Sequence, residues 1–227
     1  MYELRIADAD AFGPAAADLM AALPAGACFG LPTGHTPLPL YAELRRRGFA
    51  GWRAVMLDEY LGDPRFQAWL RAEIIDPLRI PGECFLRMPA SGTPADCDEF
   101  EHDLRAWDGC DLQFLGLGAN GHIGFNEPGS PRDSRTRVVT LTAATARANA
   151  EYRPDAHMPA QAVTQGIATI LEARRHCLLV RGAAKAAVLA AALRGPVTPA
   201  LPASFLQLSP ALTVIADPAA AQLLADR

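Results

Sequence analysis

Five short runs of apolar residues are spaced along the chain, and each stops abruptly at polar residues or glycine. Within a run the apolar residues follow one another instead of alternating with polar ones, which is typical of strands buried on both faces. The pattern predicts strands within residues 27–34, 53–60, 112–121, 176–182 and 212–218. Helix-like stretches lie between or beside them, at residues 10–23, 37–48, 65–78, 95–107 and 183–195.

The order of strand and then helix repeats along the chain. This order predicts the α/β class, with a mostly parallel, Rossmann-like sheet and helices on both of its faces. The 227 residues, of which 50% are hydrophobic, are enough for one core, so we expect a single domain over residues 1–227. Ligands of such sheets bind beyond the carboxyl ends of the strands, where we expect the chemistry to lie.

Composition narrows the range of partners. The net charge is -4 and the charged residues are scattered, so the sequence offers no basic stripe to nucleic acid. No apolar stretch reaches the roughly 20 residues that span a bilayer, and we expect no membrane partner. The five cysteines are odd in number and widely spaced, which favours reduced thiols and a cytoplasmic protein. His102, His157 and His176 lack metal-ligand spacing, so a structural zinc site is not expected.

A candidate phosphate loop, TGHT, runs from Thr33 to Thr36 between a predicted strand and a predicted helix. Backbone amides at a helix start, together with the hydroxyls of both threonines, suit a phosphate group. The spacing fits neither a nucleotide P-loop nor GxGxxG, so an ordinary strand-to-helix turn is the alternative. Lys185, which follows the strand predicted at 176–182, could neutralise the same phosphate or could be a solvated surface lysine.

Two acidic residues, Asp58 and Glu59, directly follow the apolar run that ends at Leu57. Neighbouring residues of an extended chain point in different directions, so we do not expect them to act as one carboxylate pair. Asp58 ends the apolar run and is the candidate base, because partial burial would tune its affinity for protons. Glu59 is interpreted as a structural partner. The alternative for Asp58 is an exposed cap of the strand end.

The sequence GLGANGHIGFNEPGSP, residues 116–131, places five glycines around His122 and Glu127. Histidine exchanges protons near neutral pH, and Glu127 could turn back to orient the imidazole ring. A structural histidine in a glycine-rich turn is the commoner case. The coincidence of this histidine with two acids after a strand and a candidate phosphate loop favours a reactive site.

Six segments occur, in the same order and over nearly the whole chain, as they do in one known family: GLPTGHTPLPLYAEL, VMLDEYLG, LGLGANGHIGFNEPGSP, SRTRVVTLT, PAQAVTQGIATILEA and FLQLSPALTVIAD. Together they resemble the glucosamine-6-phosphate deaminases, also called glucosamine-6-phosphate isomerases. The GHIGFNEPGS part is the most specific. The related 6-phosphogluconolactonases usually carry a GxDGHTASLFP-like stretch there, and this sequence lacks it.

The resemblance implies that glucosamine 6-phosphate and water are converted to fructose 6-phosphate and ammonia, without a metal or organic cofactor. It implies that Asp58 moves a proton between C2 and C1 of the opened sugar. It implies that His122 assists ring opening, while Glu127 and Asn120 hold and tune it. By the same resemblance, the phosphate is bound by Thr33, Gly34, His35, Thr36 and Lys185.

The sequence also departs from the pattern of the family. His35 stands where many members have a second glycine, which would narrow the phosphate pocket or add a donor. Asn120 is aspartate in some members, so Glu127 must supply the negative charge near His122. The segment after DEYLGD is shorter than in the family, so the preferred sugar could differ.

Two further departures concern phosphate binding and assembly. Glu151 replaces a phosphate-binding arginine of many members, so Arg147 or Arg153 would have to substitute. Val139 stands where the allosteric hexamers carry a lysine. We therefore expect a monomer or small homo-oligomer that N-acetylglucosamine 6-phosphate does not activate.

Two other functions remain open at the level of sequence. One is lactone hydrolysis of the 6-phosphogluconolactonase type, with His122 as the base toward water. The other is a catalytically silent phosphosugar-binding sensor, suggested by Glu151 and by the shorter segment after DEYLGD.

Overall fold

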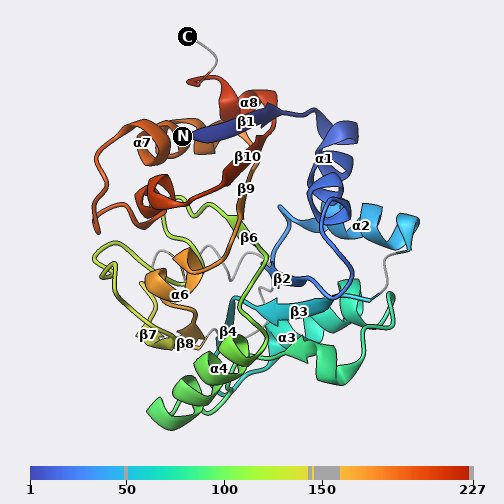
Figure 1. Ribbon diagram of the computed structural model, residues 1–227. Helices are drawn as coiled ribbons and strands as arrows, with labels where there is room; N and C mark the ends of the chain where they lie inside the picture. Colours follow the sequence, from blue (N-terminus) through green and yellow to red (C-terminus); the bar gives the residue numbers. More distant parts are fainter. Residues whose placement is uncertain (49–50, 143–144, 146–158, 225–227) are drawn as a thin grey trace.

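A computed structural model describes residues 1–48, 51–142, 145 and 159–224. At its centre is a 7-stranded sheet in which all neighbouring strands are parallel, in the order β1-β10-β9-β6-β2-β3-β5 (Figure 1). The strands are β1 (Tyr2–Ile6), β2 (Cys28–Leu31), β3 (Arg53–Met56), β5 (Phe85–Leu86), β6 (Leu112–Gly116), β9 (His176–Val180) and β10 (Leu212–Ala216). Each predicted apolar run contains one of these strands, so the predicted parallel sheet is confirmed.

Helices cover both faces of this sheet. Successive residues of a strand point to opposite sides of the sheet, so neighbouring residues of one strand pack against different helices. Phe114 and Leu179 join one buried cluster with residues of α1 and α2, whereas Leu115 and Leu178 join a second cluster with residues of α6 and α7. Figure 1 shows these two pairs of helices on opposite sides of the sheet. The helices are α1 (Ala9–Ala21), α2 (Leu38–Arg47), α3 (Arg65–Leu70), α4 (Pro94–Ala106), α6 (Ile167–Leu171), α7 (Ala186–Arg194) and α8 (Pro218–Ala221).

A second, 3-stranded sheet is not predicted by the sequence pattern. It is antiparallel, in the order β4-β8-β7, and contains β4 (Asp58–Tyr60), β7 (Arg137–Thr140) and β8 (Gln161–Thr164). The single strand predicted at 53–60 therefore divides at Leu57. Because β3 ends in the main sheet and β4 pairs with β8, Asp58 lies in a strand of the small sheet and not in a loop.

Other elements differ in detail from the prediction. The edge strand β1 and the two-residue strand β5 lack a long run of buried residues, which is why the pattern does not predict them. The helix predicted at 65–78 is α-helical only as far as Leu70 and continues as a π-helical turn at Arg71–Ile75. A 3-10 turn at Ala183–Lys185 precedes α7. Within the described ranges, none of the helices has both the length and the apolar character needed to span a bilayer.

The carboxyl ends of β2, β6 and β9 meet at one edge of the sheet, because these strands are parallel neighbours. The segments that leave them carry the turn from Thr33 to Thr36, His122 and Lys185. Gly34 and Gly182 have φ values of 91° and 93°, in the left-handed region that glycine adopts without a steric cost. The fold thus brings three of the predicted site segments to the same edge.

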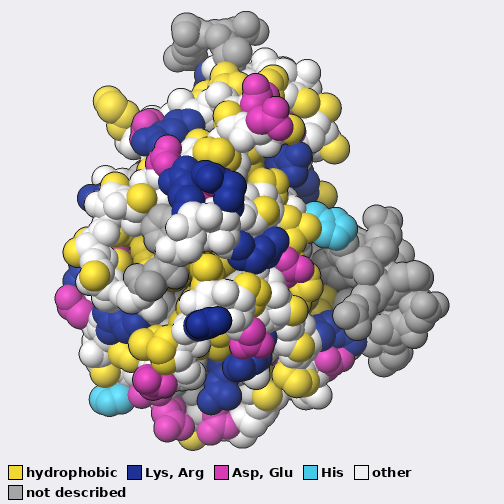
Figure 2. Space-filling model, turned by 90° about the vertical axis from the view of Figure 1, so that its right-hand side faces the viewer, with side chains coloured by type: hydrophobic (Ala, Val, Ile, Leu, Met, Phe, Trp, Pro, Cys, Tyr) yellow, Lys and Arg dark blue, Asp and Glu magenta, His cyan; other side chains and the backbone are white. Residues whose placement is uncertain are grey.

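The face of the molecule that carries α1 and α2 mixes basic and acidic side chains. Figure 2 shows Lys and Arg interspersed with Asp and Glu on this side. Two of the contacts are ion pairs of 2.7 Å, from Arg47 to Asp18 and from Arg46 to Glu43. Some of the basic side chains on this face are therefore paired with acidic ones.

Candidate active site

The glycine-rich segment after β6 folds back on itself to seat His122. The N–H of Gly118 donates to the carbonyl of His122 at 2.9 Å, and the N–H of Gly121 donates to the carbonyl of Gly118 at 3.1 Å. A Cβ atom on Gly118 would lie 2.4 Å from the imidazole Cε1. Residue 118 must therefore be glycine for the ring to lie against the backbone at this point.

A chain of hydrogen bonds fixes the His122 ring. The Nδ2 group of Asn120 donates to Oε2 of Glu127 at 2.6 Å, which leaves Oδ1 of Asn120 to face Nδ1 of His122 at 2.8 Å. Since that amide oxygen can only accept, the neutral imidazole carries its proton on Nδ1 and keeps a lone pair on Nε2. Glu127 itself accepts hydrogen bonds from Thr142, at 3.3 Å, and from Thr145.

Burial keeps this imidazole neutral. It lowers the pKa of His122, the Glu127 carboxylate acts in the opposite direction, and the charge of Lys185 lowers the pKa further. At neutral pH the free Nε2 is therefore ready to accept a proton. A Cβ atom on Gly121, the residue before His122, would lie 3.5 Å from Val188 of α7, so the helix that follows Lys185 packs against this loop.

Asp58 is a buried carboxyl, and no group in the described chain stabilises its negative charge by a hydrogen bond or an ion pair. Its side chain is 7% exposed, and none of the described groups forms a hydrogen bond or an ion pair with it. Burial, followed by the charge of Glu59, raises the pKa of Asp58 to about 8. A carboxyl with such a pKa can both accept and return a proton near neutral pH.

Glu59 has the role of a structural partner. Its carboxylate accepts hydrogen bonds from the backbone N–H groups of Tyr60 at 2.9 Å, Phe66 at 3.0 Å and Gln67 at 2.7 Å. These bonds connect β4 to the start of α3. Successive residues of β4 point in different directions, and of the two acids only Asp58 is left without such donors in the described chain.

The turn from Thr33 to Thr36 leads from β2 to α2, with Pro37 at the helix start. Its threonines and Gly34 are half-buried and His35 is exposed. The hydroxyl of Tyr41, on α2, donates to the carbonyl of Pro32 at 2.6 Å and so anchors the beginning of the turn. Burial, and then the charge of Asp58, raises the pKa of Tyr41.

Lys185 is a half-buried cation at the end of the 3-10 turn after β9. Burial lowers its pKa, and no carboxylate in the described part of the chain forms an ion pair with it. It is also the only lysine in the sequence, in which all other basic side chains except histidine are arginine. A half-buried ammonium group without a carboxylate partner suits an anionic ligand.

Contacts between these segments bring the His122 segment to the strand that carries Asp58. The His122 segment contacts the neighbourhood of Asp58, because the N–H of Phe125 donates to Oγ1 of Thr164 at 3.2 Å and Thr164 pairs with Asp58 across the small sheet. The charge of Lys185 also acts on His122. Among the described residues, no hydrogen bond joins Lys185 to the turn at 33–36, and β6 separates their strands.

Several residues singled out in the sequence have no described structure. Glu151, Arg147, Arg153 and His157 lie outside the described residues. Val139 is described, and it packs against a small apolar cluster that includes Phe125.

Two buried amides next to the site are not singled out by the sequence. Asn126 lies within the glycine-rich motif, and Gln165 follows the residues of β8. Both are almost fully buried, at 0% and 1% exposure. Buried amides are nearly always hydrogen-bonded, so both side chains are expected to have partners. The signal in the sequence that could have pointed to Gln165 is a polar residue directly after the apolar residues of a strand.

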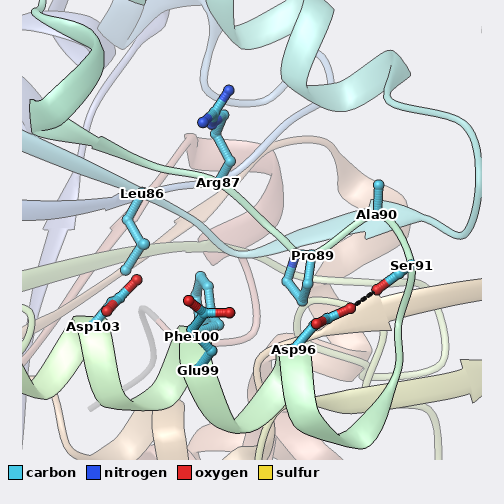
Figure 3. A pocket seen from close by; sticks show the side chains of 9 residues that line it. All are labelled: Leu86, Arg87, Pro89, Ala90, Ser91, Asp96, Glu99, Phe100 and Asp103. Carbon is cyan, nitrogen blue, oxygen red and sulfur yellow. Dashed lines mark hydrogen bonds between the residues drawn. The ribbon is translucent and has the colours of Figure 1, made fainter.

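A surface cavity of about 370 Å³ lies elsewhere, beside α4, and contains none of the predicted site residues. Figure 3 shows the carboxylates of Asp96, Glu99 and Asp103 rising from α4, with Ser91 bonded to Asp96 and the guanidinium of Arg87 pointing away from them. Acidic side chains dominate this cavity, which makes it unsuited to a phosphate.

Known proteins resemble this chain in sequence and in fold. The family model for glucosamine-6-phosphate isomerases/6-phosphogluconolactonase matches residues 10–214. A glucosamine-6-phosphate deaminase of Streptomyces coelicolor is 42% identical over 96% of this chain and 91% of its own length. Glucosamine-6-phosphate deaminase 1 of Giardia intestinalis is 40% identical over 80% of this chain and 74% of its own length.

Solved structures show the same fold. A structure of a monomeric glucosamine-6-phosphate deaminase superimposes with a TM-score of 0.88 at 34% identity, covering 97% of this chain and 99% of the other. A 6-phosphogluconolactonase of Thermotoga maritima has a TM-score of 0.77 at 18% identity, covering 96% of this chain and 100% of the other, a likeness of fold alone. The chain belongs to the glucosamine-6-phosphate isomerase/6-phosphogluconolactonase family.

Proposed function

We propose that this chain is a glucosamine-6-phosphate deaminase, which converts glucosamine 6-phosphate and water to fructose 6-phosphate and ammonia. The observation that carries the proposal is the Asp58 carboxyl, buried beside the His122 segment and with a pKa raised to about 8. The names of relatives at 40% and 42% identity support the same activity.

In the proposed reaction, Asp58 carries a proton from C2 to C1 of the opened sugar. Asp58 takes the C2 proton, the electron pair of the broken C–H bond forms a C1–C2 double bond, and the electron pair displaced from the C1–O double bond takes a proton from the ammonium group at C2, so that the aldehyde becomes an enol. Return of the proton to C1 leaves an imine at C2, which water hydrolyses to a ketone and ammonia. One carboxyl that accepts and returns the same proton is suited to both steps, and the raised pKa supports this role.

His122 would act earlier, when the sugar ring opens. Its free Nε2 would take the proton of the C1 hydroxyl while the bond between C1 and the ring oxygen breaks, and it would then give a proton to that oxygen. The hydrogen bond of 2.8 Å between Nδ1 and Asn120 supports this assignment, since it leaves Nε2 unprotonated. Glu127 supports the protonated imidazole that forms in between, because its Oε2 lies 3.9 Å from Nδ1.

The phosphate would be bound where the strands β2 and β9 end. The turn formed by Thr33, Gly34, His35 and Thr36 would supply hydroxyl and backbone donors, and Lys185 would supply the positive charge. The lowered pKa of Lys185 and its lack of a carboxylate partner within the described ranges support this role, since an anion would relieve the cost of its burial.

Ammonia release from a substrate panel tests the proposed function. We expect ammonia from glucosamine 6-phosphate, and the same panel should include galactosamine 6-phosphate and 6-phosphogluconolactone. Folded protein that releases no ammonia from either amino sugar would contradict the proposal. Hydrolysis of the lactone alone would indicate a lactonase, and binding of the phosphosugars without turnover would indicate a sensor.

We also infer that residues 1–227 act as one domain in the cytoplasm, as a monomer or small homo-oligomer. The likeness to a monomeric deaminase and the packing of Val139 against an apolar cluster support this inference. Sedimentation velocity with and without N-acetylglucosamine 6-phosphate measures the assembly. A hexamer, or a sigmoidal rate curve that this sugar makes hyperbolic, would contradict it.

A further inference from the structure

We propose that Asn126 is a positioning residue: through Gln165, it holds the segment that carries His122 against the strand end that carries Asp58. The proposal rests on the proposed function, in which these two side chains act on one sugar. Neither amide touches the reacting atoms in that scheme, so their effect would come from the separation they impose on the two groups.

Asn126 uses its whole amide group in buried hydrogen bonds. Its Nδ2 donates to the carbonyl of Ile123 at 3.0 Å and to the carbonyl of Gln165 at 2.8 Å. Its Oδ1 accepts from Nη1 of Arg137 at 2.9 Å. Carbonyls only accept and guanidinium groups only donate, so the orientation of this amide is fixed by its partners.

Gln165 extends the connection to the residues just before Asp58. Its side-chain Nε2 donates to the carbonyl of Met56 at 2.8 Å, and its backbone N–H donates to the carbonyl of Leu57 at 2.9 Å. At the other end, Asn126 holds the carbonyl of Ile123, the residue directly after His122. Two consecutive amides thus join the immediate neighbours of the proposed base and the proposed ring-opening group.

Close backbone packing also holds the His122 segment against the strand end that carries Asp58, but it does not replace the hydrogen bonds of the Asn126 amide. A Cβ atom on Gly124 would lie 2.9 Å from Oγ1 of Thr164 and 3.3 Å from Leu57, so the segment already touches the strand end. These contacts limit how closely the segment can approach the strand end, whereas the hydrogen bonds donated by Asn126 keep it from moving away. Loss of the donors would let the segment move, and a displacement of about 1 Å in an active site can cost about 100-fold in rate.

Steady-state kinetics of three variants test the proposal. We expect kcat for ammonia release to fall about 100-fold in Asn126→Ala, with KM and the Kd of glucitol 6-phosphate within about two-fold of wild type. Asn126→Asp keeps the shape of the side chain but cannot donate to the two carbonyls, so we expect a similar loss. Gln165→Met, which removes only the bond to Met56, should lose about 10-fold.

Ser209→Ala is the control for a lesion that affects stability alone. Its hydroxyl bonds to Nδ1 of the buried His176 at 2.7 Å, at the amino end of β9 and therefore at the opposite edge of the sheet. This variant should lose stability with kcat unchanged at temperatures well below its unfolding. If Asn126→Ala behaves like this control, or if Asn126→Asp keeps full activity, the proposed positioning role is wrong.

A second readout does not depend on the deaminase reaction. Nitrogen NMR of the histidine rings, with His122 assigned by His122→Gln, follows the titration of this one imidazole. Displacement of the segment in Asn126→Ala should move the midpoint by about half a pH unit, because the contacts to Asn120 and Glu127 change. If wild type releases no ammonia, the proposed function fails and this titration still decides the role of Asn126: an unchanged midpoint would overturn it.

Discussion

Two carboxyl groups of this protein are buried to nearly the same degree and have opposite pKa shifts. Asp58 is 7% exposed and Glu101, on α4, is 4% exposed. Burial alone would raise the pKa of Glu101, but hydrogen bonds from Thr136 and Thr169 and the charge of Arg135 outweigh it, so the pKa is lowered. Asp58 has no such donors in the described chain, and burial with the Glu59 charge raises its pKa to about 8.

The difference separates a structural acid from a reactive one. Oε1 of Glu101 accepts from the N–H and the hydroxyl of Thr136 at 2.9 Å and 2.6 Å and from the hydroxyl of Thr169. These bonds connect α4 to the residue before β7 and to α6. Asp58 lies at the sheet edge where the loops meet. Burial therefore does not by itself make a carboxyl reactive; the absence of compensating donors does.

Asp58→Asn should have the largest effect on activity, because it removes the reactive acid of the pair Asp58 and Glu101. Loss of the proposed base should lower ammonia release at least about 1,000-fold. Because the folded pKa of Asp58 lies above its unfolded value, wild type loses stability as pH rises through about 8. The variant lacks this loss, so the difference in the free energy of unfolding between variant and wild type should grow by on the order of 3 kcal/mol from pH 6 to pH 9.

Urea unfolding at pH 6 and pH 9 measures this change in stability. Glu99→Gln, an exposed acid on α4, is the matched control and should change neither rate nor stability. Unchanged deuterium exchange at C2 of the sugar in Asp58→Asn would remove Asp58 from its proposed role.

Glu101→Ala should affect stability and leave the chemistry intact. Removing this acid leaves the buried donors of Thr136 and Thr169 without their acceptor, and the expected cost is about 3 kcal/mol in the free energy of unfolding. The pKa of Glu101 is lowered on folding, so its contribution is present above the unfolded pKa of about 4.3 and is lost as pH falls further. The difference between variant and wild type should shrink in acid. A fall in kcat of Glu101→Ala without a loss of stability would contradict the claim that Glu101 is a structural acid.

Lys185→Met extends the comparison to cations and should give the smallest energetic effect. Arg135 pairs with Glu101 and Glu172, whereas Lys185 has no carboxylate partner in the described residues. The variant should raise KM for the phosphosugar about 10-fold. Its stability should not fall, because the variant removes a half-buried cation that has no carboxylate partner among the described residues. Arg194→Met, at the exposed far end of α7, is the control; an unchanged KM in Lys185→Met would exclude Lys185 from phosphate binding.

The large parallel sheet could be predicted because its inner strands are continuous apolar runs. Strands β2 and β9 are buried at every residue, and this leaves a clear mark in the sequence. The small antiparallel sheet leaves no such mark, since β4 reads Asp-Glu-Tyr and β7 is half-exposed. Its strands are defined by pairing over long distances in the chain, such as that of Asp58 with Thr164.

The residues of the candidate site could be predicted from the sequence, whereas the pKa of Asp58 and the hydrogen bonds that hold the site together could not. The apolar run before Asp58 and the glycines around His122 mark the two segments, and the resemblance to a family assigns their roles. The raised pKa of Asp58 depends on burial that the unpredicted small sheet helps to create. The bridge from Asn126 to Gln165 joins residues 39 positions apart, and no local pattern specifies such a pair.

The most direct test of this account is the titration of the Asp58 carboxyl itself. Carbon NMR of protein labelled at the aspartate Cγ atoms resolves it, with the signal assigned by its loss in Asp58→Asn. We expect a midpoint of about 8 in the unliganded protein. A midpoint below about 5, close to that of an exposed aspartate, would contradict the claim that burial without donors prepares Asp58 for proton transfer.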